Sequence, residues 1–474
     1  MRTFVAAAAV AAMAWAAPAL AEGDAVLEAR VARVEQRLAQ ASAREIQSSV
    51  DAYLGAARPD ASLVGGPGSA GYEGGFWVRG GSFLLKISLT LQVRWEAFNW
   101  NKEAEEPRPG GDLSGFSLPR TTLTFAGDAT CNVHYYAALE VGHSGSFLGV
   151  GNNADSTLGT LWNLHNQVSR GPGGLVGPDL GIVEAWIEYE VSPSLLFRLG
   201  LLQTAATRQL MTPPEMQQFV DISLATSWIG SMVPGYSDRN RDYGLMLHGV
   251  FGNEAEWTYL ATLTNGDGPA RRNILDQSTN DNYAYSVRLN WDAVGCRGFP
   301  IGYQEGALRQ HECEWVGSVG AWAYWYTDVL KDKPHTDFAT RFCWGVDAQA
   351  GYGSWSLTAA YSHARLDQSD IPGFDRLDGW SGLVQAGFLF PDSAWEVAAR
   401  YDVHSFDAFQ KSWGGTEIAG AVTYYIDGHS DKVTLDLSHI RGDHQADVQA
   451  DTYAGTSAVT ADAWLLRLQW QLAL

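Results

Sequence analysis

The sequence predicts an all-β protein: a sixteen-stranded antiparallel transmembrane β-barrel, preceded by a short α-helical coiled-coil segment. Two observations carry this prediction. Aromatic residues make up 12% of the chain, with 19 Trp and 19 Tyr, whereas charged residues make up only 18%. From residue 76 to the last residue, apolar and polar side chains alternate in short segments. Because successive side chains of a strand point to opposite faces, each segment has one apolar and one polar face.

Composition excludes several other classes. The 46% of apolar residues can bury a core, which argues against disorder. The net charge of -21 argues against nucleic acid as a partner, because an acidic chain repels phosphate groups. The mean hydropathy of -0.15 is too polar for a bundle of membrane helices. A barrel that is apolar only on alternate residues agrees with these values.

The first residues predict export. Arg2 precedes an apolar run over 4–17, and residues 19–21 (ALA) form a cleavage site. We therefore interpret residues 1–21 as a secretory signal peptide and exclude them from the fold. The chain is expected to cross the inner membrane of a Gram-negative cell and to reside in the outer membrane.

A helical segment is expected next, over residues 22–54. Apolar residues spaced 4-3-4-3 predict a periplasmic or oligomerising coiled coil, although an amphipathic helix packed on the rest of the chain has the same pattern. The apolar positions are Leu27, Val31, Val34, Leu38 and Ala41. Residues 55–75 are rich in Gly and Pro, which predicts a linker, and residues 76–474 form the expected barrel domain.

The strand over 84–98 illustrates the alternation. Its odd positions are all apolar, whereas Lys86, Arg94 and Glu96 lie on the other face. Many segments end in Trp or Tyr and have an aliphatic middle, which is typical of the aromatic girdles of outer-membrane barrels. A closed barrel also has no unpaired edge in lipid. A soluble secreted β-sandwich would alternate too, but its outer face would be richer in Lys and Glu.

Connection lengths give the strand count. Tight turns alternate with longer connections, which places both ends of sixteen strands on the short-turn side. The longer connections are expected near 100–118, 142–180, 203–241, 265–282, 327–340, 365–378, 405–414 and 441–460. The connection 293–314 is long although it lies on the periplasmic side. It contains Cys296 and Cys313, which predicts a disulfide in an oxidising compartment, whereas Cys131 and Cys343 are expected to stay free.

Several stretches together resemble the phosphate-selective porin O and P family over residues 75–474. They are 120–127 (RTTLTFAG), 139–142 (LEVG), 183–189 (VEAWIEY), 199–203 (LGLLQ), 219–224 (FVDISL), 241–244 (RDYG), 395–402 (WEVAARYD) and 422–429 (VTYYIDGH). The resemblance implies a sixteen-stranded barrel, commonly trimeric, with the third long loop folded into the lumen. It also implies phosphate or anion selectivity.

The charged residues on the expected lumen faces indicate a different selectivity. The chain has only six Lys, and the acidic residues on the lumen faces match the basic ones in number, which disfavours a phosphate channel. If the third loop folds inward, opposed basic and acidic sides set a transverse field that suits small polar solutes. Loop two, over 142–180, is an alternative plug. The candidate lining residues are Lys86, Arg94, Glu96, Arg120, Glu184, Glu188, Arg198, Arg208, Glu215, Asp221, Asp238, Arg239, Arg288, Arg400, Asp402 and Arg467.

The predicted function is passive diffusion of small hydrophilic solutes or ions through a water-filled channel, with ion preference left open. Ion pairing across the wall that only makes the barrel rigid is the alternative for any one lining residue. The partners expected are outer-membrane lipid and two further copies in a homotrimer. An alternative role is a structural anchor that contacts the cell wall through the N-terminal helix. No CxxC, HExxH or GxSxG motif is present, so neither an enzyme nor a cofactor is expected.

Overall fold

The computed structural model describes residues 68–72, 75–100, 113–142, 179–230, 232–233, 240–252, 255–266, 283–293, 303–306, 315–330, 337–371, 374–408, 411–445 and 458–474. The expected signal peptide and coiled coil lie outside the described residues, as do Cys296, Cys313, Asp238 and Arg239. The described chain belongs almost wholly to one unit that begins at Ser69. Ser69–Tyr72, at the end of the expected linker, already forms a strand.

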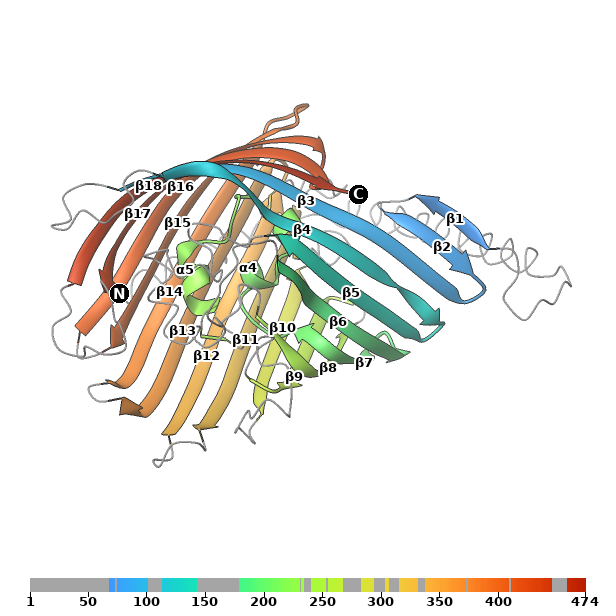
Figure 1. The fold of residues 1–474 in the computed structure, drawn as a ribbon, viewed down its shortest axis with the longest axis horizontal. Coiled ribbons are helices and arrows are strands. Elements are labelled where there is room, and N and C mark those ends of the chain that lie inside the picture. Colours follow the sequence, from blue (N-terminus) through green and yellow to red (C-terminus); the bar gives the residue numbers. More distant parts are fainter. Residues whose placement is uncertain are drawn as a thin grey trace, which may run out of the picture. The chain divides into compact units, whose positions relative to one another are not determined.

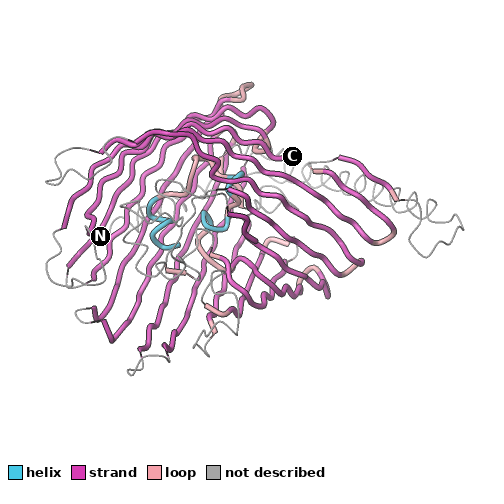
Figure 2. The backbone as a smooth tube through the Cα atoms, viewed as in Figure 1, coloured by secondary structure: helices cyan, strands magenta, loops and turns pink. Residues whose placement is uncertain are grey.

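Strands make up most of this unit, as Figure 2 shows. In chain order they are β1 (Ser69–Tyr72), β2 (Phe76–Gly80), β3 (Phe83–Trp100), β4 (Leu113–Thr130), β5 (Val133–Gly142), β6 (Asp179–Ser192), β7 (Leu195–Gln203), β8 (Arg241–Phe251), β9 (Trp257–Thr264), β10 (Ala284–Ala293), β11 (Trp315–Leu330), β12 (Asp337–Tyr352), β13 (Trp355–Ile371), β14 (Phe374–Leu389), β15 (Trp395–Ala408), β16 (Lys411–Asp427), β17 (Asp431–Gln445) and β18 (Ala458–Ala473). Between β7 and β8 lie α4 (Arg208–Met211), the 3-10 turn η3 (Pro214–Met216) and α5 (Leu224–Gly230).

Strands β3–β18 close into an antiparallel barrel of sixteen strands (Figure 1). Each strand pairs with the next one in the chain, and β18 pairs back with β3 to complete the ring. Closure leaves no row of unpaired backbone groups, which is the condition for a sheet to sit in lipid. The predicted sixteen-stranded antiparallel barrel is therefore confirmed.

The seam of the barrel involves both ends of the unit. Along the same edge of β3, β18 pairs with Thr90–Trp100, and β2 pairs with residues 83–87. Between them, Leu474 and Leu89 exchange two backbone hydrogen bonds, of 3.0 and 2.8 Å. The last residue of the chain thus lies between two strands that share one edge.

The alternation seen in the sequence becomes the two faces of the wall. On β13, Trp355 and Leu357 are about half exposed, whereas Ser356 and Thr358, which alternate with them, are buried. The exposed face is apolar and carries aromatic rings at the strand ends, such as the Trp395–Tyr424 pair on β15 and β16. This arrangement matches an outer apolar belt with aromatic residues at its borders.

Most predicted connections lie where the sequence placed them, but two do not. The regions 365–378 and 405–414 were expected to be loops; instead β13 and β14 remain paired out to Ile371 and Phe374, and β15 and β16 out to Ala408 and Lys411. Ion pairs line the first extension, since Asp367 contacts both Arg365 and Arg376 at 2.8 Å. The polar composition of these residues suggested loops. They belong instead to strand ends that continue the backbone pairing of the hairpin.

Candidate functional site: the barrel lumen

The lumen face of the wall is polar and densely packed over β10–β18. On β17, Thr434, Asp436 and Ser438 are buried, whereas Leu435 and Leu437 on the other face are exposed. A buried inner face requires material inside the ring, because the inner side chains of an empty barrel would contact water. That material comes from two connections.

The larger one is loop 3, the connection between β7 and β8, of which residues 204–230, 232–233 and Asn240 are described. Its helices α4 and α5 lie inside the ring of strands in Figure 1. Nearly all of its described residues are buried. The prediction that the third loop folds into the lumen is confirmed, whereas loop two lies outside the described residues.

Carboxylates of the wall hold the backbone of loop 3. The backbone N–H of Arg208 donates to Asp347 over 3.0 Å, and that of Val220 donates to Asp436 over 3.1 Å. At the first turn of α5, the N–H groups of Leu224 and Ala225 donate to Glu417 and Asp402, each over 3.0 Å. Helix-start N–H groups lack partners within a helix, so these wall carboxylates satisfy donors that would otherwise be unpaired in a buried place.

Asp221 of loop 3 sits among three guanidinium groups of the wall. Its carboxylate lies 2.8 Å from Arg94, 3.5 Å from Arg120 and 3.5 Å from Arg467. Burial alone would raise the pKa of Asp221, but the three positive charges outweigh burial and hold that pKa below its usual range. Arg94 also donates to Gln469 of β18 over 2.9 Å. This cluster ties loop 3 to β3, β4 and β18.

Two further basic groups under loop 3, Arg288 and Arg400, are paired with carboxylates of the wall. Arg288 makes a two-pronged contact with Asp347 at 2.6 and 2.8 Å. Arg400 donates to Glu417 over 2.6 Å and to the backbone oxygen of Asp221 over 2.8 Å. Charged hydrogen bonds made in pairs by one guanidinium group hold its side chain in a fixed orientation, and the bond from Arg400 to Asp221 also holds loop 3.

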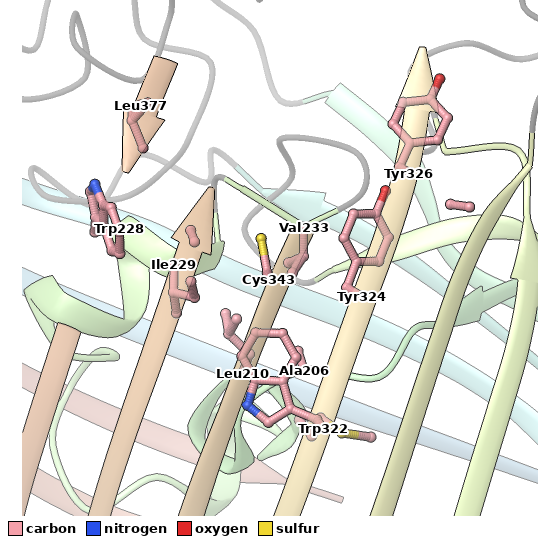
Figure 3. Close-up of a cluster of buried hydrophobic side chains, with 13 residues drawn as sticks. Ala206, Leu210, Trp228, Ile229, Val233, Trp322, Tyr324, Tyr326, Cys343 and Leu377 are labelled. Carbon is pink, nitrogen blue, oxygen red and sulfur yellow. The ribbon is translucent and has the colours of Figure 1, made fainter. Parts of the chain in front are cut away.

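An apolar cluster completes the attachment of loop 3. Leu210, Trp228 and Ile229 of the loop belong to one buried cluster with Trp322 and Tyr324 of β11 (Figure 3). Cys343, Ala364 and Leu377 extend the same cluster over β12, β13 and β14. Apolar residues on the inner face of a barrel have no lipid to contact, so the loop provides the surface that buries them.

The second inner element comes from the end of the barrel that carries the tight turns. Residues 303–306 belong to the long connection between β10 and β11, and Glu305 is 1% exposed. The Glu305 carboxylate accepts hydrogen bonds from Gln209 at 3.0 Å, from the Gln218 N–H at 3.2 Å and from Gln385 at 3.0 Å. Its own N–H donates to the backbone oxygen of Met216 over 2.8 Å. Sequence reasoning noticed the length of this connection but missed its inward fold, for which the sequence holds no periodic signal.

The inner face of β4–β8 has a different character. Trp186 of β6 stacks on Tyr136 of β5 with ring centroids 5.4 Å apart, and the Arg198 guanidinium lies 3.7 Å from the Trp186 ring centroid. Arg198 also contacts Glu188 at 2.8 Å. Most inner side chains here keep partial exposure, because the described part of loop 3 leaves them uncovered.

The predicted lining residues therefore divide into two sets. The set that is buried between loop 3 and the wall consists of Arg94, Arg208, Asp221, Arg288, Arg400, Asp402 and Arg467. The other candidates lie on the inner faces of β3–β7 or at the edge of loop 3; they are Lys86, Glu96, Arg120, Glu184, Glu188, Arg198 and Glu215. Of these, Glu188 is also nearly buried, by Arg198 and His248.

In the described part of the chain, no group of three or more His, Cys, Asp or Glu side chains could hold a metal ion. None of the described helices is long and apolar enough to cross a membrane. Cys131 and Cys343 are free thiols, as predicted, one exposed and one buried.

Comparison with known proteins gives likeness of fold. No protein-family model and no curated protein sequence matches the chain. Among solved structures, the anion-selective porin of Comamonas acidovorans is similar with a TM-score of 0.50 and 10% identity, over 82% of this chain and 100% of that one. The outer-membrane channel DcaP of Acinetobacter baumannii gives a TM-score of 0.46 and 12% identity, over 82% and 97% of the two chains. OmpF of Salmonella typhi, in complex with daunomycin, gives 0.47 and 12%, over 85% and 100%. The chain thus has the barrel fold of an outer-membrane porin.

Proposed function

We propose that this chain is an outer-membrane porin, through which small hydrophilic solutes and ions diffuse passively. The observation that carries the proposal is the sorting of the wall: a closed ring of sixteen strands with an apolar outer face and a polar, charged inner face. An apolar exterior suits lipid, and a polar interior suits water and solutes in transit. Export by the signal peptide and membership of the phosphate-selective porin O and P family are further parts of the proposal.

Loop 3 sets where solutes pass. It occupies the lumen next to β10–β18 through many simultaneous contacts, so it acts as a fixed constriction and not as a mobile lid. Solutes then pass along the inner faces of β3–β8, where side chains keep partial exposure. Selection by a constriction of this kind depends on size and charge.

We further propose that three copies associate through the outer faces of β4–β7. Their described outward side chains include no Trp; they are Phe, Tyr, aliphatic and small, such as Phe125, Ala137, Ile187 and Leu199. Outward Trp residues recur instead on β9–β18, for example Trp291, Trp325 and Trp470. Trp is favoured where a protein meets the lipid headgroups, so a face without it suits protein contact.

Single-channel recording tests the channel. Purified full-length protein reconstituted in planar bilayers should give discrete, stable conductance steps in KCl, and unheated protein should migrate on a gel as a compact oligomer of three chains. Refolded protein that migrates as a barrel yet gives no steps would overturn the porin function. A monomer in detergent and in cross-linking experiments would overturn the trimer alone.

A further inference from the structure

We propose that the channel prefers cations, because the packing of loop 3 buries Arg side chains together with the carboxylates that neutralise them, and acidic groups outnumber Lys and Arg among the charged side chains that stay partly exposed along the solute path. The inference rests on the proposed channel function and adds its selectivity. It follows from which charged groups are buried, which remain partly exposed, and what each contacts.

Most of the basic groups that the sequence places along the lumen on β10–β18 and β3 are buried. Arg94, Arg288, Arg400 and Arg467 are at most 2% exposed. Each is bonded to a carboxylate, with atoms 2.6 to 2.8 Å apart. A guanidinium group held in this way has its charge compensated by its neighbour and cannot approach a passing anion. These residues, which sequence alone would place along an anion path, are used to attach loop 3.

Other charged groups stay partly exposed on the inner faces of β3–β8 and on loop 3. Within the described residues, the acidic ones are Glu96, Asp128, Glu140, Glu184, Glu190 and Glu215. The Lys and Arg side chains are Lys86, Arg120, Arg198 and Arg241. Two His side chains lie there as well: His134 contacts Asp128 and Glu190, and His248 contacts Glu188. The acidic set is larger than the Lys and Arg set, before the nearly buried Glu188 is added to it.

Most of the exposed Lys and Arg side chains of this face already have carboxylate partners. Arg198 contacts Glu188 at 2.8 Å, and Arg241 contacts Glu184 at 3.0 Å. Arg120 lies 3.5 Å from Asp221. Three of the four exposed bases therefore face a carboxylate, and Glu140 accepts a hydrogen bond from the Thr122 hydroxyl over 3.2 Å among its contacts.

A net negative lining attracts cations and repels anions, and low-dielectric walls strengthen the effect. We expect a K⁺ to Cl⁻ permeability ratio of roughly three or more at low salt, and a smaller ratio at high salt because mobile ions screen the lining.

The test is the reversal potential of the full-length protein in a planar bilayer, across about a tenfold KCl gradient. Its sign should correspond to cation preference. The double variant Glu140→Gln and Glu190→Gln should lower the permeability ratio by about half or more, whereas Lys86→Gln should raise it.

Asp392→Asn provides the matched control. Asp392 is exposed in the turn between β14 and β15 and has a φ of 54°, a conformation that Asn tolerates. The control removes one carboxylate charge away from the inner face and should leave the ratio unchanged.

The result separates the two proposals. Conductance steps with a ratio at or below one, or a ratio that the inner-face variants leave unchanged, would overturn the cation preference while the porin function stands. An absence of steps in the unmodified protein would overturn both. Variant channels with steps of ordinary size show that the barrel has folded, so their reversal potentials can be compared directly.

Discussion

The inner faces of β10–β18 and of β4–β8 belong to one ring of strands but differ in what covers them. On β10, Ser286, Arg288 and Asn290 are buried and alternate with the exposed Val287 and Leu289. On β4, successive side chains from residue 120 to 128 are all of intermediate exposure. The two groups of strands have the same alternating sequence pattern. The difference in exposure of their inner side chains therefore comes from loop 3 and residues 303–306, which cover only one group. An inner barrel face becomes a protein core only where another part of the chain covers it.

The strongest way to break this difference is to remove the charge of Asp221. In Asp221→Asn, three guanidinium groups lose their shared carboxylate, and Arg94 is fully buried. Removing one partner of a buried pair costs about 3–5 kcal/mol, so loop 3 should detach for part of the time. Amide hydrogen exchange of residues 217–230 should accelerate, and single-channel currents should become larger and noisier.

Asp367→Asn is the control for that prediction. Asp367 also contacts two Arg side chains at 2.8 Å, but its side chain is 38% exposed at the end of β13. Exposed pairs contribute about 0–1 kcal/mol, so exchange in loop 3 should stay unchanged. Equal effects from both variants would contradict the assigned role of the Asp221 cluster.

The next largest effect is expected from Glu305→Gln, which tests the cover that residues 303–306 provide. The carboxylate accepts from three donors, and the amide replaces one acceptor oxygen with a competing donor. A hydrogen bond to a charged group contributes about 1.5–3 kcal/mol. Exchange at the Gln218 amide should accelerate, while exchange in α5, which Glu305 does not contact, should change less. Unchanged exchange at Gln218 would show that residues 303–306 do not hold loop 3.

A smaller effect is expected from adding one carbon at Gly387 on the inner face of β14. A Cβ there would collide with the side chains of Gln218 and Glu396, which bond to each other. Overfilling of this kind costs about 1–3 kcal/mol, so Gly387→Ala should lower the temperature at which the gel band converts to the unfolded form.

Gly382→Ala on the same strand is the matched variant. The nearest atom to its new Cβ lies 3.8 Å away, an ordinary contact. It should therefore unfold at the same temperature as the unmodified protein. A similar shift in both variants would attribute the effect to strand flexibility and not to contact with loop 3.

Acidification should have the smallest effect on loop 3 near neutral pH. Because the pKa of Asp221 is held below its usual range, the stabilisation is complete above the ordinary pKa of about 4 and is lost only as pH falls further. Hydrogen exchange of residues 217–230, corrected for intrinsic rates, should be the same at pH 7 and pH 5. Accelerated exchange already at pH 5 would contradict the pairing.

The sequence predicted the ring of strands because alternation is a local property. The apolar and polar faces of 84–98 follow from the spacing of residues along one strand, whatever surrounds it. The inward position of loop 3 came from resemblance and not from pattern, since 204–240 has no period. Which arginine would be buried could not be predicted, because Arg94 and Arg120 both lie on inner faces and differ only in how closely the loop approaches.

The extended ends of the β13–β14 and β15–β16 hairpins show a related limit. Composition alone made Asp367 and Arg376 look like loop residues, and only the partner strand shows that they are paired across a ladder. The inward position of Glu305 could not be predicted either, because its partners Gln209 and Gln385 are distant in the sequence. A pairing across the hairpin decides the first case and contacts between distant segments decide the second, and a single sequence records neither.

The seam at β3 has a consequence for how the chain can be altered. Because β18 and β2 divide one edge of β3 between them, the N–H and C=O groups of residues 83–87 depend on β2 for their partners. A chain shortened to begin at residue 81 would present that stretch as an open edge, which is a template for pairing with strands of other molecules. Residues added after Leu474 would compete with β2 for the same place. The two ends of this unit therefore act as a cap against aggregation, and fusion partners belong in the loops.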